Sequence, residues 1–293
     1  MPEFAKRQRA LRSTHPTNSS WRRKMGRLEN KVALIIGAGQ SPGEAIGNGR
    51  ATAIRFAQEG ASIFSVDRNL DSARETLTMA GIDDSRGAAH QSDVRDAESL
   101  RSAVDAAVAK WGRIDILHYN VGVNALGNDQ PLETMTEDTF DAVNAINLRG
   151  CIMVAKFVEP IMREQRSGVL INVSSMSAVE TSTSYVAYRT SKAGMIAFTQ
   201  QFAMRNAPYG IRANSILPGR IDTAVAVDVR AQRTGKTRDE LVAERNALIP
   251  LQGYTATGWD VANSALFLAS DEAGFVTGVS LPVDGGSLTK IGW

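Results

Sequence analysis

The stretch VALIIGAGQSPGEAIGNGRA, residues 32–51, decides the fold. It begins with five consecutive apolar residues, Val32–Ile36, a pattern typical of a strand buried on both faces of a sheet. Five glycines follow, and a helical pattern runs from Ala51 to Glu59. Glycines allow positive φ and a close approach of the backbone to a diphosphate, whose charge suits the N-terminus of the following helix. The stretch therefore predicts the first half of a nucleotide-binding βαβ unit, with an ordinary glycine-rich turn as the alternative.

Strand and helix patterns continue to alternate along the chain. Further strands are predicted at 61–67, 88–93, 114–120, 169–174, 211–217 and 279–283. Helices are predicted at 70–80, 98–111, 137–165, 185–207 and 261–269, with charged, irregularly helical sequence at 224–257. Such alternation produces right-handed βαβ crossovers. We therefore expect an α/β fold, a Rossmann-type doubly wound parallel sheet of about seven strands with helices on both faces, in one domain over residues 25–293.

The charge of the chain is unevenly distributed. The net charge of 293 residues is +2, but residues 1–24 hold seven basic residues and one acid, so the remaining residues sum to −4. Residues 1–24 lack periodicity, and we expect a disordered basic tail there. A transit peptide and a nucleic-acid-binding arm are the alternatives for this tail. The mildly acidic remainder gives no indication of nucleic-acid binding.

Cysteine usage and hydropathy narrow the class of protein further. The single cysteine, Cys151, lies in an apolar helical run, which favours a buried thiol in a reducing, cytoplasmic compartment. No apolar stretch approaches about 18 residues, so we expect no membrane span.

An acid ends the second predicted strand. Asp67 lies 18 residues after Gly49, where a carboxylate accepts hydrogen bonds from the adenosine ribose hydroxyls and repels a 2′-phosphate. Arg68 follows directly and can pair with such a phosphate. The sequence therefore predicts NAD as cofactor, with NADP less favoured; a helix cap or a surface acid is the alternative role for Asp67.

Tyr188 and Lys192 lie four residues apart at the start of an apolar-periodic run through Phe202. On a helix these positions share one face. A lysine ammonium beside a phenol favours the phenolate, so it lowers the pKa of a tyrosine from its usual value of about 10 toward neutrality. Such a tyrosine can exchange a proton with an alcohol or a ketone. A chance surface pair is the alternative.

These motifs together resemble the short-chain dehydrogenase/reductase family over essentially all of residues 25–293. The family's glycine motif corresponds to Ile36-Gly37 and Gly47-Asn48-Gly49, with Ile36 in place of its threonine. Seven residues separate Gly39 from Gly47, where the family usually has one. The chain is most similar to a branch with an extended glycine-rich loop that ends in Gly-Asn-Gly.

The resemblance implies a set of cofactor contacts. Asp93-Val94 matches the family's adenine contact, and the segment from Pro218 to Thr223 matches the one that holds the nicotinamide carboxamide. In the motif after the fourth strand, Tyr119 and Val121 depart from the family pattern, and we expect altered packing there rather than lost binding. The implied contacts are Gly37, Gly39, Gly47, Asn48, Gly49, Asp67, Arg68, Asp93, Val94, Asn120, Gly122, Tyr188, Lys192, Pro218, Gly219, Ile221 and Thr223.

The resemblance also implies a catalytic tetrad of Asn147, Ser175, Tyr188 and Lys192, with Ser175 13 residues before Tyr188. Tyr188 would be the general acid/base, and Lys192 would lower its pKa and hold the nicotinamide ribose. Ser175 would hydrogen-bond the substrate oxygen, and Asn147 would hold a water on the proton path to Lys192. No metal is expected, because His15, His90 and His118 have no ligand spacing. We expect His118 to be a hydrogen-bonded strand residue.

The substrate is expected to lie beneath a mobile lid at about 224–257, on a floor that includes Met176, Val179 and Tyr185. The apolar lid residues Val225, Val227, Leu241, Leu248 and Ile249 are candidates to enclose it, and the basic lid residues are interpreted as a solvated helix face. This mixture favours a medium-sized, partly apolar or aromatic secondary alcohol or its ketone.

Several alternatives stay open. Sugars and 3-oxoacyl compounds are alternative substrates, and a non-catalytic nucleotide-sensing or scaffold protein is an alternative function. The resemblance further implies a homotetramer, or a homodimer, in which the helices at 137–165 and 185–207 pack across a two-fold axis.

Overall fold

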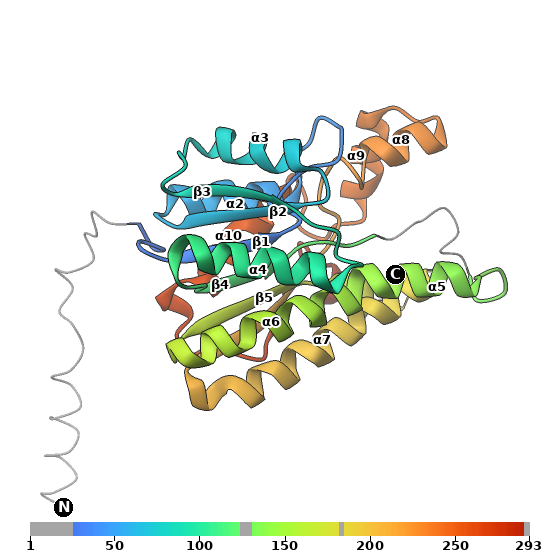
Figure 1. Cartoon of the computed structure of the whole chain (residues 1–293). Helices are drawn as coiled ribbons and strands as arrows, with labels where there is room; N and C mark the ends of the chain where they lie inside the picture. The colour runs from blue at the N-terminus through green and yellow to red at the C-terminus, as the bar shows by residue number, and fades with distance from the viewer. Residues whose placement is uncertain (1–25, 124–130, 182–184, 290–293) are drawn as a thin grey trace, which may run out of the picture.

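Seven parallel strands form one sheet in the order β3-β2-β1-β4-β5-β6-β7 in the computed structural model (Figure 1). The structure describes residues 26–123, 131–181 and 185–289, so the expected basic tail lies outside the described residues. The order reverses between β1 and β4, which confirms the predicted doubly wound sheet. The strands are β1 Val32–Ile36, β2 Ser62–Asp67, β3 Gly87–Gln91, β4 Ile116–Tyr119, β5 Gly168–Val173, β6 Ile211–Pro218 and β7 Ser280–Val283.

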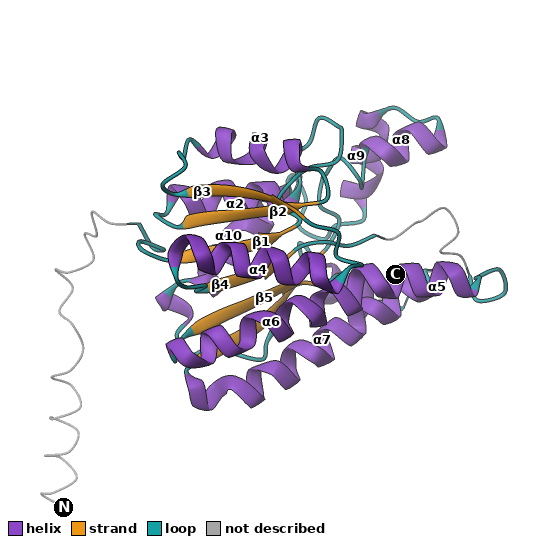
Figure 2. Ribbon diagram, viewed as in Figure 1, coloured by secondary structure: helices purple, strands orange, loops and turns teal. Residues whose placement is uncertain are grey.

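Helices cover both faces of the sheet (Figure 2). Side chains alternate along each strand, so Leu34 and Ile36 enter one core and Ala33 and Ile35 enter the other. The first core packs beneath α4 Ala97–Trp111, α6 Gly150–Gln165 and α7 Val186–Asn206. The second packs beneath α2 Asn48–Gln58, α3 Leu70–Ala80 and α10 Gly258–Ala269.

Local signals fix the ends of several helices. Asn69 caps α3 through its side chain, which accepts a hydrogen bond from the Ser72 amide at 3.1 Å. Gly81 ends the same helix with a φ of 66°. The prediction of a helix over 70–80 is confirmed because both signals lie next to it in the sequence.

The predicted helix over 137–165 contains a turn that the sequence did not indicate. α5 Glu137–Asn144 continues through a π-helical turn, Ala145–Arg149, into α6. The buried Tyr119 hydroxyl donates to the Ile146 carbonyl oxygen of this turn at 2.5 Å. A Cβ on Gly150 would lie 2.6 Å from that hydroxyl, so glycine is what lets the two elements meet. Tyr119, one of the two departures from the family pattern, thus packs against this turn.

The helical parts of 224–257 are α8 Asp228–Thr234 and α9 Arg238–Ala247. They lie at the same end of the sheet as α5 and the loop that follows β1 (Figure 1). In the described part of the chain, no helix is long and apolar enough to cross a membrane.

Candidate active site

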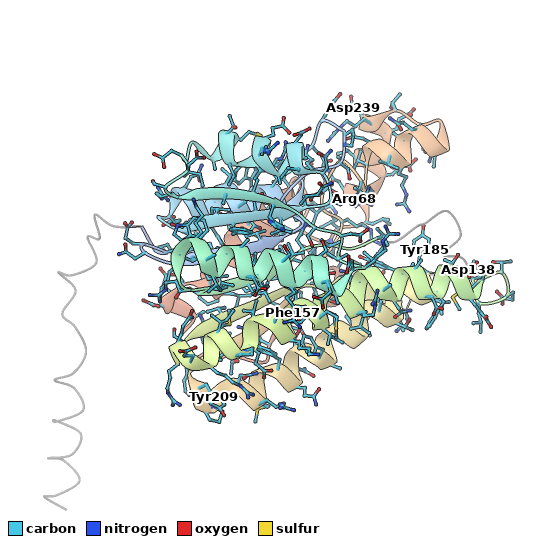
Figure 3. The ribbon with its side chains drawn as sticks, in the orientation of Figure 1. Arg68, Asp138, Phe157, Tyr185, Tyr209 and Asp239 are labelled. Carbon is cyan, nitrogen blue, oxygen red and sulfur yellow. The ribbon has the colours of Figure 1, made fainter. Side chains whose placement is uncertain are left out.

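The carboxyl edge of the sheet gathers the predicted site residues. Figure 3 shows Arg68 and Tyr185 toward this edge, where the lid residue Asp239 also lies, whereas Tyr209 lies at the opposite end. In a doubly wound sheet a nucleotide binds at this edge, beside the point where the strand order reverses.

Tyr188 and Lys192 lie on one side of the first turns of α7. The Lys192 side chain is buried, and its Nζ donates to the Val173 carbonyl oxygen at 2.7 Å. The same nitrogen lies 5.9 Å from the centroid of the Tyr188 ring. Burial lowers the pKa of Lys192 to about 8. The lysine thus places a desolvated cation beside the tyrosine ring, where an anionic partner would be strongly favoured.

Ser174 and Ser175 follow β5 and have different roles. The Ser174 hydroxyl donates to the Lys192 carbonyl oxygen at 2.8 Å, which fixes α7 against the strand. The Ser175 Oγ accepts a hydrogen bond from the Ser177 amide at 3.1 Å. This bond orients the Ser175 oxygen while its O–H keeps the capacity to donate.

Asn147 lies in the π-helical turn and is buried. Its Oδ1 accepts from the Val123 amide at 2.8 Å, and its Nδ2 donates to the Val123 carbonyl at 3.0 Å and to Ser191 Oγ at 3.0 Å. A Cβ on Gly122 would lie 2.8 Å from Lys192 Nζ and 3.6 Å from Asn147 Oδ1. Asn147 therefore anchors the segment after β4 beside Lys192, and Ser191 is a member of this network that the sequence reasoning missed.

Three glycines between the end of β1 and the start of α2 lie so close to neighbouring atoms that a side chain at any of them would clash. Gly37 has a φ of +83°, which favours glycine. A Cβ on Gly49 would lie 1.9 Å from the Gly37 carbonyl oxygen, and one on Gly39 would lie 2.7 Å from the Asp67 carboxyl carbon. Asn120 Nδ2 donates to the same Gly37 oxygen at 3.2 Å. The glycines therefore let β1, the start of α2 and Asp67 lie in close contact at the edge where a dinucleotide would bind.

Several backbone amides of the extended loop already donate hydrogen bonds to side chains of the protein. Those of Gly39, Gln40 and Gly47 donate to Asp67 Oδ2, Ser72 Oγ and Gln40 Oε1, at 3.0, 2.8 and 2.9 Å. By contrast, α2 starts at the N-cap Gly47 with no side-chain cap, and the buried Asn48 Oδ1 has no partner among the described residues. The first amides of α2 are therefore the ones left to meet a phosphate.

Two backbone amides orient the Asp67 carboxylate at the end of β2. Its Oδ2 accepts from Gly39 and its Oδ1 accepts from the Asn69 amide at 3.0 Å, which leaves acceptor sites on both oxygens. Arg68 is exposed (Figure 3). This geometry is compatible with the expected contact of Asp67 with an adenosine ribose, which stays a prediction.

Two further segments are expected to contact the adenine and the nicotinamide of the cofactor. Asp93 pairs with Arg95 at 2.5 Å, and hydrogen bonds from Arg95 lower the pKa of Asp93. Its neighbour Val94 is buried. Gly219 follows Pro218 at the end of β6, and a Cβ there would lie 2.7 Å from the Asp284 Cα.

Ile221 and Thr223 continue the nicotinamide segment. Ile221 is buried, and Thr223 Oγ1 accepts from the Ala226 amide at 3.3 Å at the start of the lid. The segment expected to contact the nicotinamide, which ends at Thr223, therefore leads directly into the lid.

Some of the residues expected to contact the substrate are buried, and others are exposed to solvent. Met176 is buried in a short 3₁₀ turn, Val179 is half-exposed, and Tyr185 caps the start of α7. In the lid, Val227, Leu241 and Ile249 are buried in its own packing, whereas Val225 and Leu248 are exposed. The last two are the apolar lid residues free to meet a substrate.

Arg238 of α9 joins the lid to the extended glycine loop. Its Nη2 contacts both oxygens of Asp222 at 2.7 Å, and its Nε lies 3.1 Å from Asp228 and 3.6 Å from Glu44. The Glu44 amide also donates to Asp228 Oδ2 at 3.0 Å. The hydrogen bonds that Arg238 donates to Asp222 raise the pKa of Arg238. No local sequence pattern indicates this cluster, because its members come from three separate segments.

His118 differs from expectation. It is fully buried in β4, and neither ring nitrogen has a hydrogen-bond partner among the described residues, so the expectation of a hydrogen-bonded histidine is wrong. The reason is its position facing the apolar core, where the nearest ring is that of Phe56 at 6.2 Å. Within the same described ranges, no group of three or more His, Cys, Asp or Glu residues is arranged to hold a metal.

Comparison with known proteins gives consistent matches over most of the chain. The family model described as enoyl-(acyl carrier protein) reductase matches residues 43–287. A 3-oxoacyl-[acyl-carrier-protein] reductase of Thermotoga maritima is 37% identical, over 89% of this chain and 98% of the relative. A cyclohexanol dehydrogenase of Rhodococcus is 34% identical, over 88% and 96%. A solved structure described as a short-chain dehydrogenase/reductase from Burkholderia xenovorans superposes with a TM-score of 0.83 at 38% identity, over 91% of this chain and all of that one. That of levodione reductase does so with a TM-score of 0.81 at 32% identity, over 90% of this chain and all of that one.

Proposed function

Because the chain belongs to the short-chain dehydrogenase/reductase family, a family of oxidoreductases, we propose that it transfers a hydride between a secondary alcohol and its ketone with NAD. The observation that carries the proposal is the buried Lys192 ammonium, which lies beside the Tyr188 ring and is bound to the carbonyl of the strand that leads to Ser175.

In this proposal, Tyr188 exchanges the proton of the substrate oxygen. It donates the proton to a ketone as the carbinol forms, and it accepts the proton from an alcohol in the reverse direction. The Lys192 cation favours the phenolate, and the Ser175 hydroxyl donates to the same substrate oxygen. NAD, when bound, supplies the hydride acceptor or donor.

Substitution of Tyr188 tests this assignment. Tyr188→Phe removes the exchangeable proton but keeps the ring, so we expect kcat to fall by about 10²- to 10⁴-fold. NADH binding, followed by fluorescence titration, should stay within a factor of about two.

The matched control is Tyr209→Phe, because Tyr209 lies beyond the opposite end of α7 (Figure 3). It should leave both kcat and NADH binding unchanged. Full activity in the Tyr188 variant would exclude Tyr188 as the acid/base. Tight NADH binding without turnover of any alcohol or ketone by the unmodified chain would instead favour a nucleotide-sensing or scaffold function.

The proposed preference for NAD rests on Asp67. Its carboxylate is fixed by two backbone amides, and it would repel a 2′-phosphate. We expect a lower KM for NAD than for NADP, and Asp67→Ser should reduce the ratio of the two kcat/KM values by about tenfold or more. Initial rates with each cofactor measure this. A lower KM for NADP in the unmodified chain would show that Arg68 outweighs Asp67.

The proposed substrate is a medium-sized, partly apolar alcohol or ketone. The half-exposed Val179 and the exposed lid residues Val225 and Leu248 support an apolar contribution to its binding. Relatives whose names specify cyclohexanol, D-threitol and 3-oxoacyl-[acyl-carrier-protein] keep sugar and acyl substrates as the alternatives. A panel of these three classes, followed by NADH absorbance in both directions, distinguishes them.

The assembly proposed for the chain is a homotetramer, with a homodimer as the alternative. Its two-fold contact would use α5, α6 and α7. A surface hollow of about 440 Å³ on α5 and α6, lined in part by Leu148, Ile152 and Met153, supports this choice.

A further inference from the structure

Three arginines extend from the segments on the lid side of the proposed site. Arg220 lies in the segment after β6, Arg230 lies on α8, and Arg245 lies on α9. The Arg220 guanidinium reaches the other wall, where its Nη1 lies 4.0 Å from the Met176 sulfur. Met176 directly follows Ser175, so Arg220 extends to the residue next to the proposed substrate-oxygen donor.

The charge of Arg220 is incompletely compensated. The nearest carboxylate oxygen, Oε1 of Glu180, lies 3.9 Å from its Nη2, beyond hydrogen-bond distance. Among the described residues, its side chain makes one other polar contact, a long one to the weakly accepting sulfur of Met176. A guanidinium has five N–H donors, so most of those of Arg220 are available to a ligand.

Arg245 lies behind Arg220 and also lacks an acid of its own. Its Nη2 donates to the Ile221 carbonyl oxygen, the residue after Arg220, at 3.2 Å. The carboxylate of Asp222 is bound by Arg238 instead, at 2.7 Å. Within the described ranges, neither Arg245 nor Arg230 takes part in an ion pair.

The pKa of Arg245 reflects both its burial and the two neighbouring arginines. Burial, and to a smaller extent the charges of Arg230 and Arg220, lower its pKa to about 10, against an opposing effect of Asp222. The charges of Arg230 and Arg220 therefore repel that of the half-buried Arg245. A bound anion would offset this repulsion.

Building on the proposed hydride-transfer function, we propose that the substrate carries an anionic oxygen group, a carboxylate or a phosphate, that Arg220 binds. The planar fork of a guanidinium matches either group with two parallel hydrogen bonds. The positive charges of Arg245 and Arg230 add to the electrostatic attraction for this anionic group. Arg238 thus holds the acids on the glycine-loop side, whereas Arg220 reaches the residue that follows Ser175.

Matched substrate pairs test the proposal. We would compare a series of straight-chain oxo acids, from 3-oxobutanoate to 6-oxoheptanoate, with the corresponding oxo amides. In the unmodified chain, kcat/KM for the acid should exceed that for its amide by at least about tenfold at one chain length or more. Arg220→Met should reduce this ratio to near one, mainly by lowering kcat/KM for the acid, whereas Arg220→Lys should keep part of the ratio.

A binding measurement separates this proposal from the proposed reaction. The thermal shift of the protein loaded with oxidised NAD, which cannot reduce a ketone, is measured with each oxo acid and each amide, for the unmodified chain, Arg220→Met, Arg245→Met and Arg205→Met. Arg205 is exposed near the end of α7, far from the site, and is the matched control. The acid should stabilise the unmodified chain and the control more than its amide does, and this difference should be lost in Arg220→Met and, provided that it folds, in Arg245→Met.

Each outcome decides one proposal. Equal turnover of acid and amide, or an acid-specific shift that survives Arg220→Met, would overturn the anion site and leave the proposed reaction intact. The same shift in all variants, with no acid preference, would also overturn it. An acid-specific shift that needs Arg220, without reduction of any ketone, would support the anion site and overturn the proposed reaction.

Discussion

A neutral histidine in an apolar core has a measurable energetic consequence. His118 is enclosed on all sides, and burial lowers its pKa to about 3. In the unfolded chain its pKa returns to the ordinary value of 6.5. Below pH 6.5 the unfolded state therefore binds a proton that the folded state does not, so the free energy of unfolding falls as the pH decreases toward 3.

We predict that His118→Leu makes stability less dependent on pH. His118 alone removes up to about 1.4 kcal/mol of stability for each pH unit below its ordinary pKa, which sums to about 2 kcal/mol at pH 5. Urea unfolding at pH 5 and at pH 7.5 should give a smaller difference for the variant than for the unmodified chain. His90→Gln is the control, since His90 is only partly buried at the end of β3. Identical pH slopes for the unmodified chain and His118→Leu would contradict the prediction.

Residue identity was enough to predict part of the site. Tyr188 and Lys192 share a helix face because the helix period places them there, and Asp67 ends a strand whose pattern is visible in the sequence. The absence of partners at His118 was not predictable, because it depends on Phe56 and on other core residues distant in sequence. The role of Ser191 was hidden for the same reason, since its partner Asn147 comes from another helix.

The lid and the extended glycine loop form one structural unit at the scale of elements. Arg238 of α9 contacts Asp222, Asp228 and Glu44, and Gly43 packs so closely that a Cβ there would lie 2.3 Å from Asp228 Oδ2. The loop borders the proposed cofactor position and the lid borders the proposed substrate position. Ordering of one by its ligand should therefore favour the closed position of the other.

We predict that Arg238→Met raises KM for both NAD and the alcohol, by about 3- to 30-fold, while kcat at saturation changes less. The variant leaves three acids without their common cation, so the lid should separate from the loop. Initial-rate kinetics over both concentrations provide the measurement. Lys236→Met is the control, because Lys236 pairs with Glu244 on the exposed side of the lid. Equal KM values in Arg238→Met and the unmodified chain would show that the two segments act independently.

Helix boundaries show why some elements were predictable and others were not. The ends of α3 depend on Asn69 and Gly81, which lie beside the helix in the sequence. The π-helical turn at Ala145–Arg149 contacts Tyr119 of β4, so no local pattern reveals it. Signals that depend on neighbours in sequence were visible, and those that depend on neighbours in space were not.

For the molecule as a whole, the doubly wound parallel sheet followed from the alternating pattern of strands and helices, but the assembly did not. The outer sides of α5 and α6 carry a hollow bordered by apolar residues, and Met204 on α7 is 74% exposed. Apolar surface of this kind is a candidate for contact between copies of the chain.

We predict that the chain is tetrameric by light scattering and that Ile152→Arg gives a smaller species. A charge at the hollow would be desolvated without a partner in the assembled state, which disfavours association. Thr78→Arg, on the exposed side of α3, is the control and should keep the larger species. A monomer for the unmodified chain, or no change for Ile152→Arg, would exclude α5 and α6 as the contact.

The contact between Tyr119 and the turn above it constrains how this sequence can evolve. The tyrosine hydroxyl occupies the space that a side chain at position 150 would need. The backbone carbonyl of Val94 lies almost as close, so a smaller residue at 119 would not by itself admit a side chain at 150. Selection should therefore keep glycine at position 150 even in lineages that change position 119. Because Asn147 lies within the same turn, this requirement also preserves the backbone that positions Asn147.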